Sequence, residues 1–185
     1  MEDSPVLTDA LGLFHTYKEL AEKAMAQVND EEFFQQIDDE SNSIALVVKH
    51  LAGNLRSRWS DFLTADGEKP DRDRDGEFVT EVEDTRASLE ARWQEGWRIA
   101  LATLESLSDK DLQREVRIRR EPHTVLKAVN RNLTHLAYHT GQIAFLAKHL
   151  AGQRWQTLSM PRNRSRHSTR QAAPEKTTGK TSRSR

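Results

Sequence analysis

Two histidines, His135 and His139, lie four residues apart in a segment whose apolar residues recur at helical spacing. On a helix, side chains at this spacing leave the same face with Cβ atoms about 6 Å apart, so both imidazoles can reach one metal ion. The pattern alone is weak evidence, because seven histidines in 185 residues produce about 0.26 such pairs by chance. A metal site therefore needs support from the rest of the chain.

The helical phase of the histidines places them beside an apolar face. His135 comes directly before Leu136, about 100° around the helix from the apolar stripe. His50 likewise precedes Leu51 in another amphipathic segment, so it lies on the same kind of polar edge. Helical bundles build metal sites from side chains on facing helices. If these two helices are neighbours, His50 supplies a third imidazole.

The elements that must position these side chains are amphipathic helices. Apolar residues recur at steps of three and four, and helices are expected at 5–29, 42–64, 85–107 and from 122 to about 151. The start and stop signals are Pro5 and Pro122 in first turns, Ser41 or Ser43 and Asp84 as N-caps, and Gly152 as a C-terminal cap. Four long helices of this kind predict an all-α four-helix bundle.

Two connections differ from simple turns. Residues 67–78 alternate in charge and contain glycine and proline, which predicts an exposed connection whose length favours a rim or lid role. Residues 113–121 alternate loosely around Val116 and Ile118. A short extended piece would fit there, but an isolated strand lacks a pairing partner, so we interpret this segment as a linker. The tryptophans at 59, 93 and 97 fall on apolar stripes and are expected in the core.

The composition limits the chemistry. The chain has no cysteine, which excludes disulfides, thiolate nucleophiles and cysteine-ligated zinc, so a metal must be held by His, Asp or Glu. A length of 185 residues suits a single domain. No segment approaches the roughly 18 apolar residues of a membrane span, and the beginning lacks the basic and apolar regions of a secretion signal. The cytoplasm is therefore the expected location.

The C-terminal tail differs from the rest. After position 160 there are eight Lys or Arg and one acidic residue, which leaves residues 1–160 net acidic. Few large apolar residues follow Met160, so residues 163–185 are expected to be a disordered basic tail, after a domain at 1–162. The tail could attract nucleic acid, but no aromatic residue accompanies its charges, and a solvated terminus is the preferred interpretation.

The histidines lie within longer motifs. KHLAGN at 49–54 and HLAYHTGQI at 135–143 resemble the DinB/YfiT-like superfamily of metal-binding four-helix bundles. RSRWSDFL at 56–63, DGEKPDRDRDGEF at 66–78 and TLSMPR at 157–162 resemble a DinB-like branch of unknown function. The resemblance covers residues 5–162. It implies that His50, His135 and His139 hold the metal, and that the protein is a homodimer.

Three neutral imidazoles would leave a divalent ion its full charge and an open position. Zinc or nickel is favoured, and iron, manganese or copper would also be compatible. The resemblance implies a metal-dependent enzyme with a small-molecule substrate, and specifically a transferase that uses a low-molecular-weight thiol. A hydrolase ranks lower, because no HExxH-type acid accompanies the ligands. The alternative is a non-catalytic metal-containing stress-response protein, or one that binds a ligand or nucleic acid. The sequence identifies no catalytic residue.

Other polar residues near the proposed ligands leave alternatives open. Gln142 and Asn54 could orient imidazoles, or could form hydrogen bonds between helices. Arg131 and Tyr138 could meet an anionic substrate or donate a proton, but a solvated arginine and a packed tyrosine are preferred.

The remaining histidines are not assigned to the site. His149 lies in a second KHLAG, but it is ten residues beyond His139 and therefore about 15 Å along the axis. It is interpreted as a helix C-terminal histidine. His15, His123 and His167 are assigned no role.

Overall fold

The structure is a computed structural model and describes residues 4–159. The chain divides into two units, Met1–Trp155 and Gln156–Arg185, and the fold below is that of the first. The described residues form five α-helices and one two-stranded sheet. These elements are α1 (Pro5–Met25), α2 (Asp30–Phe34), α3 (Ile44–Trp59), α4 (Arg86–Ser106), β1 (Glu115–Ile118), β2 (Glu121–Thr124) and α5 (Val125–Ala151). A predominantly helical protein is therefore confirmed, and the short two-stranded sheet is an element that the predicted all-α fold did not include.

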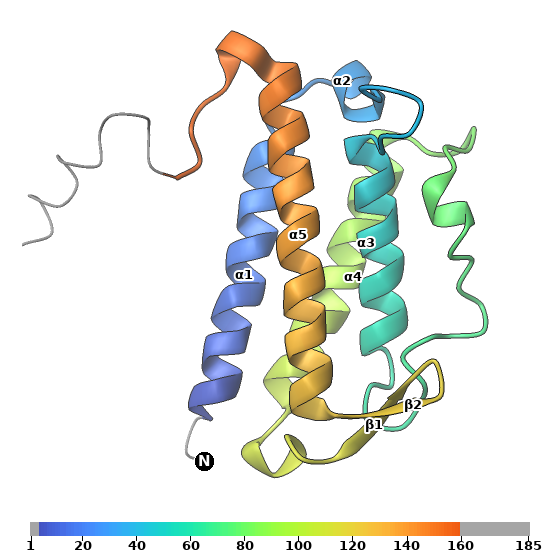
Figure 1. Cartoon of the computed structure of the whole chain (residues 1–185), viewed down its shortest axis with the longest axis vertical. Coiled ribbons are helices and arrows are strands. Elements are labelled where there is room, and N and C mark those ends of the chain that lie inside the picture. Colours follow the sequence, from blue (N-terminus) through green and yellow to red (C-terminus); the bar gives the residue numbers. More distant parts are fainter. Residues whose placement is uncertain (1–3, 160–185) are drawn as a thin grey trace, which may run out of the picture. The chain divides into compact units, whose positions relative to one another are not determined.

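Four long helices pack side by side (Figure 1). Helix α3 lies against α4 and α5, and α1 lies against α5 and α4. Helices α3 and α4 run in the same direction: Lys49 near the start of α3 reaches Asp84 just before α4, and Thr103 late in α4 donates to the Trp59 carbonyl at the end of α3. Helix α5 runs opposite to α3 along its side (Figure 1).

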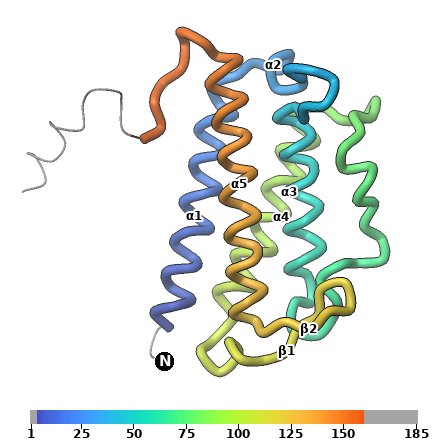
Figure 2. The backbone as a smooth tube through the Cα atoms, viewed as in Figure 1, coloured from blue at the N-terminus to red at the C-terminus, as the bar shows by residue number. Residues whose placement is uncertain are grey.

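The parallel pair α3 and α4 explains the long connection predicted from the sequence. The 16 residues of α3 span about 24 Å, and the chain must return over that distance before α4 can begin. Residues 60–85 make this return beside α3, as the tube in Figure 2 shows. They include the short 3₁₀ turn η1 (Gly76–Phe78), which packs on α3.

Aromatic side chains fill the core between the long helices. Phe14 meets Trp59 and Trp97 edge to face, at centroid distances of 5.5 and 6.1 Å. Trp93 packs on Trp97 at 5.5 Å, and all four rings are fully buried or nearly so. The prediction that the three tryptophans belong to the core is confirmed.

Residues 113–124 correct the linker and the start of the last helix. Strands β1 and β2 pair antiparallel, with Val116 opposite His123. The turn residues Arg119 and Arg120 both have positive φ, 55° and 66°, as two-residue hairpin turns require. Pro122 therefore lies in β2, and α5 begins three residues later behind the cap Thr124. The partner strand was missed because Pro122 also suits a helix start.

Other helix limits follow the predicted signals with exceptions. Ser43 caps α3 and Gly152 ends α5 at φ 53°, as expected. The first helix ends at Met25 instead of 29, and α3 ends at Trp59 instead of 64. Thr85 is the N-cap of α4, so the cap assigned to Asp84 is wrong. The Asp84 side chain binds Lys49 instead.

Two further expectations from the sequence concern the C-terminal tail and a membrane span. The disordered tail predicted at 163–185 lies outside them. Among residues 4–159, no helix combines the length and the apolar composition needed to cross a membrane.

Candidate metal centre

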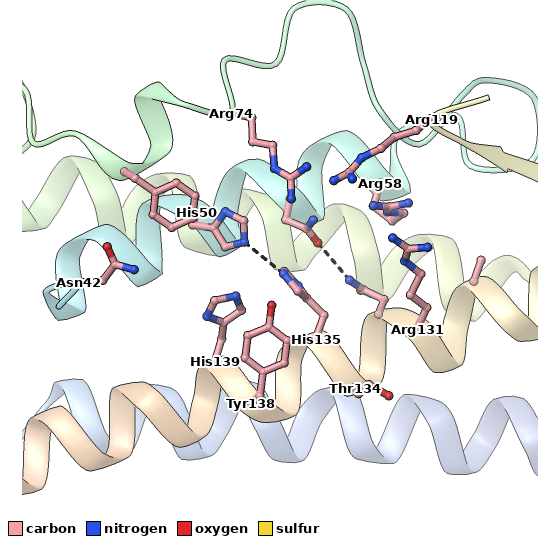
Figure 3. Close-up of a pocket in the computed structure, with 14 residues that line it drawn as sticks. Asn42, His50, Arg58, Arg74, Arg119, Arg131, Thr134, His135, Tyr138 and His139 are labelled. Atoms are coloured by element: carbon pink, nitrogen blue, oxygen red, sulfur yellow. Dashed lines mark hydrogen bonds between the residues drawn. The ribbon is translucent and has the colours of Figure 1, made fainter. Parts of the chain in front are cut away.

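The three predicted histidines lie together. His50 extends from α3, and His135 and His139 extend from successive turns of α5 toward it (Figure 3). The Nε2 atoms of His50 and His135 are 3.1 Å apart. One ring nitrogen of each histidine lies within 4.8 Å of the others. Because α3 and α5 are antiparallel neighbours, residues 85 positions apart in the sequence share one site.

This cluster fits a divalent transition metal. Two ligands at about 2.0–2.1 Å from a tetrahedral ion are about 3.3 Å apart, close to the observed separation of the His50 and His135 nitrogens. The Nε2 atom of His139 is buried and has no hydrogen-bond partner among the described residues. A buried nitrogen normally has a partner, so an unpaired one beside two other imidazoles is what a ligand position requires. The three histidines could therefore bind a metal ion.

Burial keeps the imidazoles of α5 neutral. Desolvation, followed by the nearby His139 and His50, lowers the pKa of His135 to about 3. Desolvation and the neighbouring His50 lower the pKa of His139 to about 4, although Gln142 acts in the opposite direction. At neutral pH both rings therefore keep the lone pair that metal binding needs.

A carboxylate orients His50. The His50 Nδ1–H donates to Glu77 Oε2 at 2.8 Å, which leaves Nε2 free to face the other imidazoles. Arg72 holds the same carboxylate through two hydrogen bonds, of 2.7 and 2.8 Å. Burial alone would raise the pKa of Glu77, but the hydrogen bonds from Arg72 and His50 outweigh it and lower that pKa. Phe78 stacks on the His50 ring at 4.7 Å.

The place of Glu77 depends on Gly53 in α3. A Cβ atom added at Gly53 would lie 2.1 Å from Glu77 Oε1, far inside contact distance. Glycine at this position lets the carboxylate approach the helix next to His50. Sequence analysis missed Glu77 and Arg72, since they lie in the connection and no local pattern shows that it folds back on α3.

Two polar residues one helical turn from the ligands have different roles. The His139 Nδ1–H donates to Gln142 Oε1 at 2.7 Å, so Gln142 orients an imidazole. The Asn54 Oδ1 accepts from Asn132 Nδ2 at 3.1 Å, and Asn132 Oδ1 accepts from Trp59 Nε1 at 2.8 Å. Asn54 is thus part of a hydrogen bond between helices α3 and α5, which was the other alternative.

The histidines face a pocket of about 590 Å³. Arg131 and Tyr138, which sequence analysis placed beside the ligands, both line it. Tyr138 is about half exposed, and desolvation raises its pKa, so its hydroxyl stays protonated at neutral pH. No Asp or Glu is among the lining residues, which are Asn42, His50, Asn54, Arg58, Arg74, Phe78, Arg119, Ala128, Arg131, Asn132, Thr134, His135, Tyr138 and His139.

The other histidines stay outside this centre. His149 and His15 are exposed, and His123 is buried in β2. His167 lies outside the described residues. Within residues 4–159, no second group of three His, Asp or Glu side chains could hold a metal ion.

The fold and the site define a class: a helical protein with a three-histidine cluster that could bind a metal ion. The chain belongs to the family described as "Protein of unknown function (DUF1572)", which it matches over residues 3–164. No curated protein and no solved structure matches the chain. The family description names no activity, and the DinB/YfiT-like assignment stays a prediction.

Proposed function

We propose that this protein is a metal-dependent enzyme built on a four-helix bundle of the DinB/YfiT-like type. His50, His135 and His139 are its metal ligands. The observation that carries the proposal is the buried, unpaired Nε2 atom of His139, which shares its space with the ring nitrogens of the other two histidines. The hydrogen bonds that His50 donates to Glu77 and His139 donates to Gln142 add to this support, because they fix two of the three rings.

Zinc or nickel is the favoured ion, and iron, manganese or copper remains compatible with three imidazoles. When bound, such an ion supplies a Lewis acid with its full divalent charge and an open coordination position. The chain's own residues hold it and shape the pocket. Tyr138 presents a protonated hydroxyl that can donate a hydrogen bond to a bound molecule.

The proposed reaction is group transfer to a low-molecular-weight thiol. The thiol sulfur forms a new bond to the transferred group, and the bond between that group and its leaving group breaks. The leaving group departs with the bonding electron pair, and the thiol proton is released to the leaving group or to water. Two observations support this class. The chain has no cysteine, which fits a thiol that is supplied by a cosubstrate. No carboxylate of residues 4–159 lines the pocket, so a hydrolase would lack a carboxylate base there.

Cobalt substitution tests the thiol proposal. The visible spectrum of the Co²⁺-loaded protein should change when N-acetylcysteine or glutathione is added, because a sulfur ligand alters the absorption of the ion. N-acetylserine, which replaces the sulfur with oxygen, is the matched control and should cause no such change. A spectrum that stays unchanged with both thiols would contradict a thiol-using transferase.

The same experiment identifies the alternative, a non-catalytic metal-containing stress-response or ligand-binding protein. No carboxylate of residues 4–159 lines the pocket, and this lack of a carboxylate base favours the second candidate. Stoichiometric metal with a spectrum insensitive to thiols would support this alternative. Nucleic-acid binding through residues 163–185 would appear as salt-sensitive DNA retention that is lost when those residues are deleted.

We also propose a cytoplasmic homodimer, as the resemblance and the sequence imply. Phe145 on α5 is an exposed apolar side chain outside the pocket that a second copy could cover. Sedimentation equilibrium should give twice the chain mass. A Phe145→Glu variant should shift the protein toward the monomer, and a monomeric wild type would contradict the dimer.

A further inference from the structure

Four arginines from four separate segments surround the pocket next to the histidines (Figure 3). Arg58 comes from α3, Arg131 from α5, Arg119 from the hairpin turn and Arg74 from the connection before α4. Guanidinium groups repel one another, so elements far apart in the sequence gain nothing from bringing their cations together unless an anion lies between them. The arrangement therefore points to a ligand.

Arg58 is the strongest of these observations. The residue is only 5% exposed, and its Nη1 atom is buried without a partner. Within residues 4–159 no hydrogen bond or ion pair of Arg58 is found. Buried charges are normally paired, because desolvation is otherwise uncompensated. Burial and the neighbouring Arg131 lower the pKa of Arg58 to about 10, which still leaves it charged at neutral pH.

The nearby carboxylates of residues 4–159 do not pair with Arg58, Arg74 or Arg131. Glu68 lies 3.4 Å from both Arg72 and Arg119. Asp66 accepts backbone N–H groups, including those of Arg119 and Arg120. Arg131 and Arg74 form no ion pair within the described residues. Arg119 is therefore paired with Glu68, whereas Arg58, Arg74 and Arg131 form no ion pair with any carboxylate of residues 4–159.

We propose that this pocket binds a small organic molecule with two or more negative charges, carboxylate or phosphate, whose anionic group lies between Arg58 and Arg131. Guanidinium groups suit both anions, because their N–H donors match two oxygens at once. A volume of about 590 Å³ suits a small molecule. The depth of Arg58 argues against a polynucleotide, whose phosphates reach only exposed side chains.

The anion would be the substrate of the proposed enzyme. Only its role as a substrate rests on the proposed function. The anion site itself consists of arginines and does not need the metal. Anion binding and metal binding can therefore fail separately, and the experiment measures them separately.

Calorimetric titration with succinate and with glycerol 3-phosphate tests the proposal, with succinamide and glycerol as neutral controls. Each titration uses the full-length protein as purified and again after chelation, at constant ionic strength. We expect at least one anion to bind both forms with a Kd below about 1 mM. The anion that binds more tightly identifies carboxylate or phosphate as the preferred group. Neutral controls should not bind.

Two variants locate the anion. Arg58→Met keeps the side-chain volume and should weaken binding about 10–100-fold, and Arg131→Met, at an exposed position, should act in the same direction without affecting folding. Arg98→Met is the matched control, since Arg98 is exposed and its ion-pair partner within residues 4–159 is Glu95, outside the pocket. Removal of an unpaired buried charge should leave Arg58→Met at least as stable as the wild type in anion-free buffer.

Several results would overturn the proposal. These are no binding of either anion up to about 10 mM, or equal binding by the wild type and both pocket variants. Anion binding that disappears on chelation but persists in both variants would show that the anion binds the metal alone. This result would support the metal site and contradict the arginine site. If the protein contained no metal but bound the anion, the arginine site would be supported and the metal site would be contradicted.

Discussion

The sequence KHLAG occurs twice, at 49–53 in α3 and at 148–152 where α5 ends, and the two copies have opposite environments. Lys49 and His50 are 8% and 2% exposed, whereas Lys148 and His149 are both exposed. The difference shows that identical residues acquire their roles from what packs against them. The connection at 60–85 covers one side of α3, while the second copy lies in the last turn of its helix.

Lys49, His50 and Gly53 have contacts that the matching residues of the second copy lack within residues 4–159. Lys49 Nζ donates to Asp84 at 2.7 Å and to the Val79 carbonyl at 2.9 Å, and His50 binds Glu77. The glycines differ as well. Gly53 makes room for a carboxylate, but Gly152 is needed for its positive φ of 53°, with nothing near its missing side chain.

The largest expected effect comes from the two histidines. His50→Ala removes one of three proposed ligands. Zinc affinity should therefore fall by more than the roughly 10–100-fold that follows loss of a residue that only hydrogen-bonds to a ligand. His149→Ala should keep wild-type affinity. Competition with a chromophoric chelator measures both. Equal affinities of the two variants would show that the copies do not differ in metal binding.

The lysines should differ in their effect on stability. Lys49→Met leaves Asp84 buried with only Arg92, at 3.4 Å, as a charged partner, so the free energy of unfolding should fall by about 3 kcal/mol. Lys148→Met should change it by less than about 0.5 kcal/mol. Urea unfolding of the two variants in chelator gives the comparison. A small effect at Lys49 would mean that this ion pair contributes little.

The glycines should separate metal affinity from stability. Gly53→Ala would push Glu77 away from His50 and should weaken zinc binding about 10–100-fold. Gly152→Ala should leave zinc binding unchanged but cost about 1–3 kcal/mol of stability, because alanine is strained at that backbone conformation. If Gly53→Ala kept full affinity, Glu77 would not be a positioning residue for the metal.

The smallest effect is a dependence on pH. Burial alone would raise the pKa of Asp84, but hydrogen bonds from Lys49 and the Glu81 N–H lower it. A lowered pKa contributes stability that is present above the unfolded value, about 3.9, and is lost as the pH falls through the folded value. Between pH 7 and pH 3, Lys148→Met should therefore lose more unfolding free energy than Lys49→Met. Equal losses would contradict the Lys49–Asp84 coupling.

Periodicity and motif were enough to place the long helices, the buried tryptophans and the three clustered histidines. His149 could be rejected from the axial rise alone, and its exposure agrees. These features depend on local repeats, which a single sequence displays. The position of His50 on a polar edge indicated a candidate ligand. It forms a site with His135 and His139 only because α5 lies beside α3.

The features that sequence analysis missed depend on contacts between distant segments. No periodic pattern identifies Glu77 or Arg58. Glu77 acquires its role because the connection packs against α3 beside His50, and Arg58 because other segments join α3 around the pocket. The hairpin was missed because Pro122 fits both a helix start and a strand. The parallel direction of α3 and α4, which requires the long connection, is likewise not visible in any local pattern.

The most direct test of the central claim is the metal content of the full-length protein purified without a histidine tag. We expect about one equivalent of a divalent transition metal per chain in the wild type and in His149→Ala, and almost none in a His50→Ala/His135→Ala variant. A folded wild type that contains no stoichiometric metal and takes up none when zinc or nickel is supplied would contradict it. So would a double variant that keeps a full equivalent.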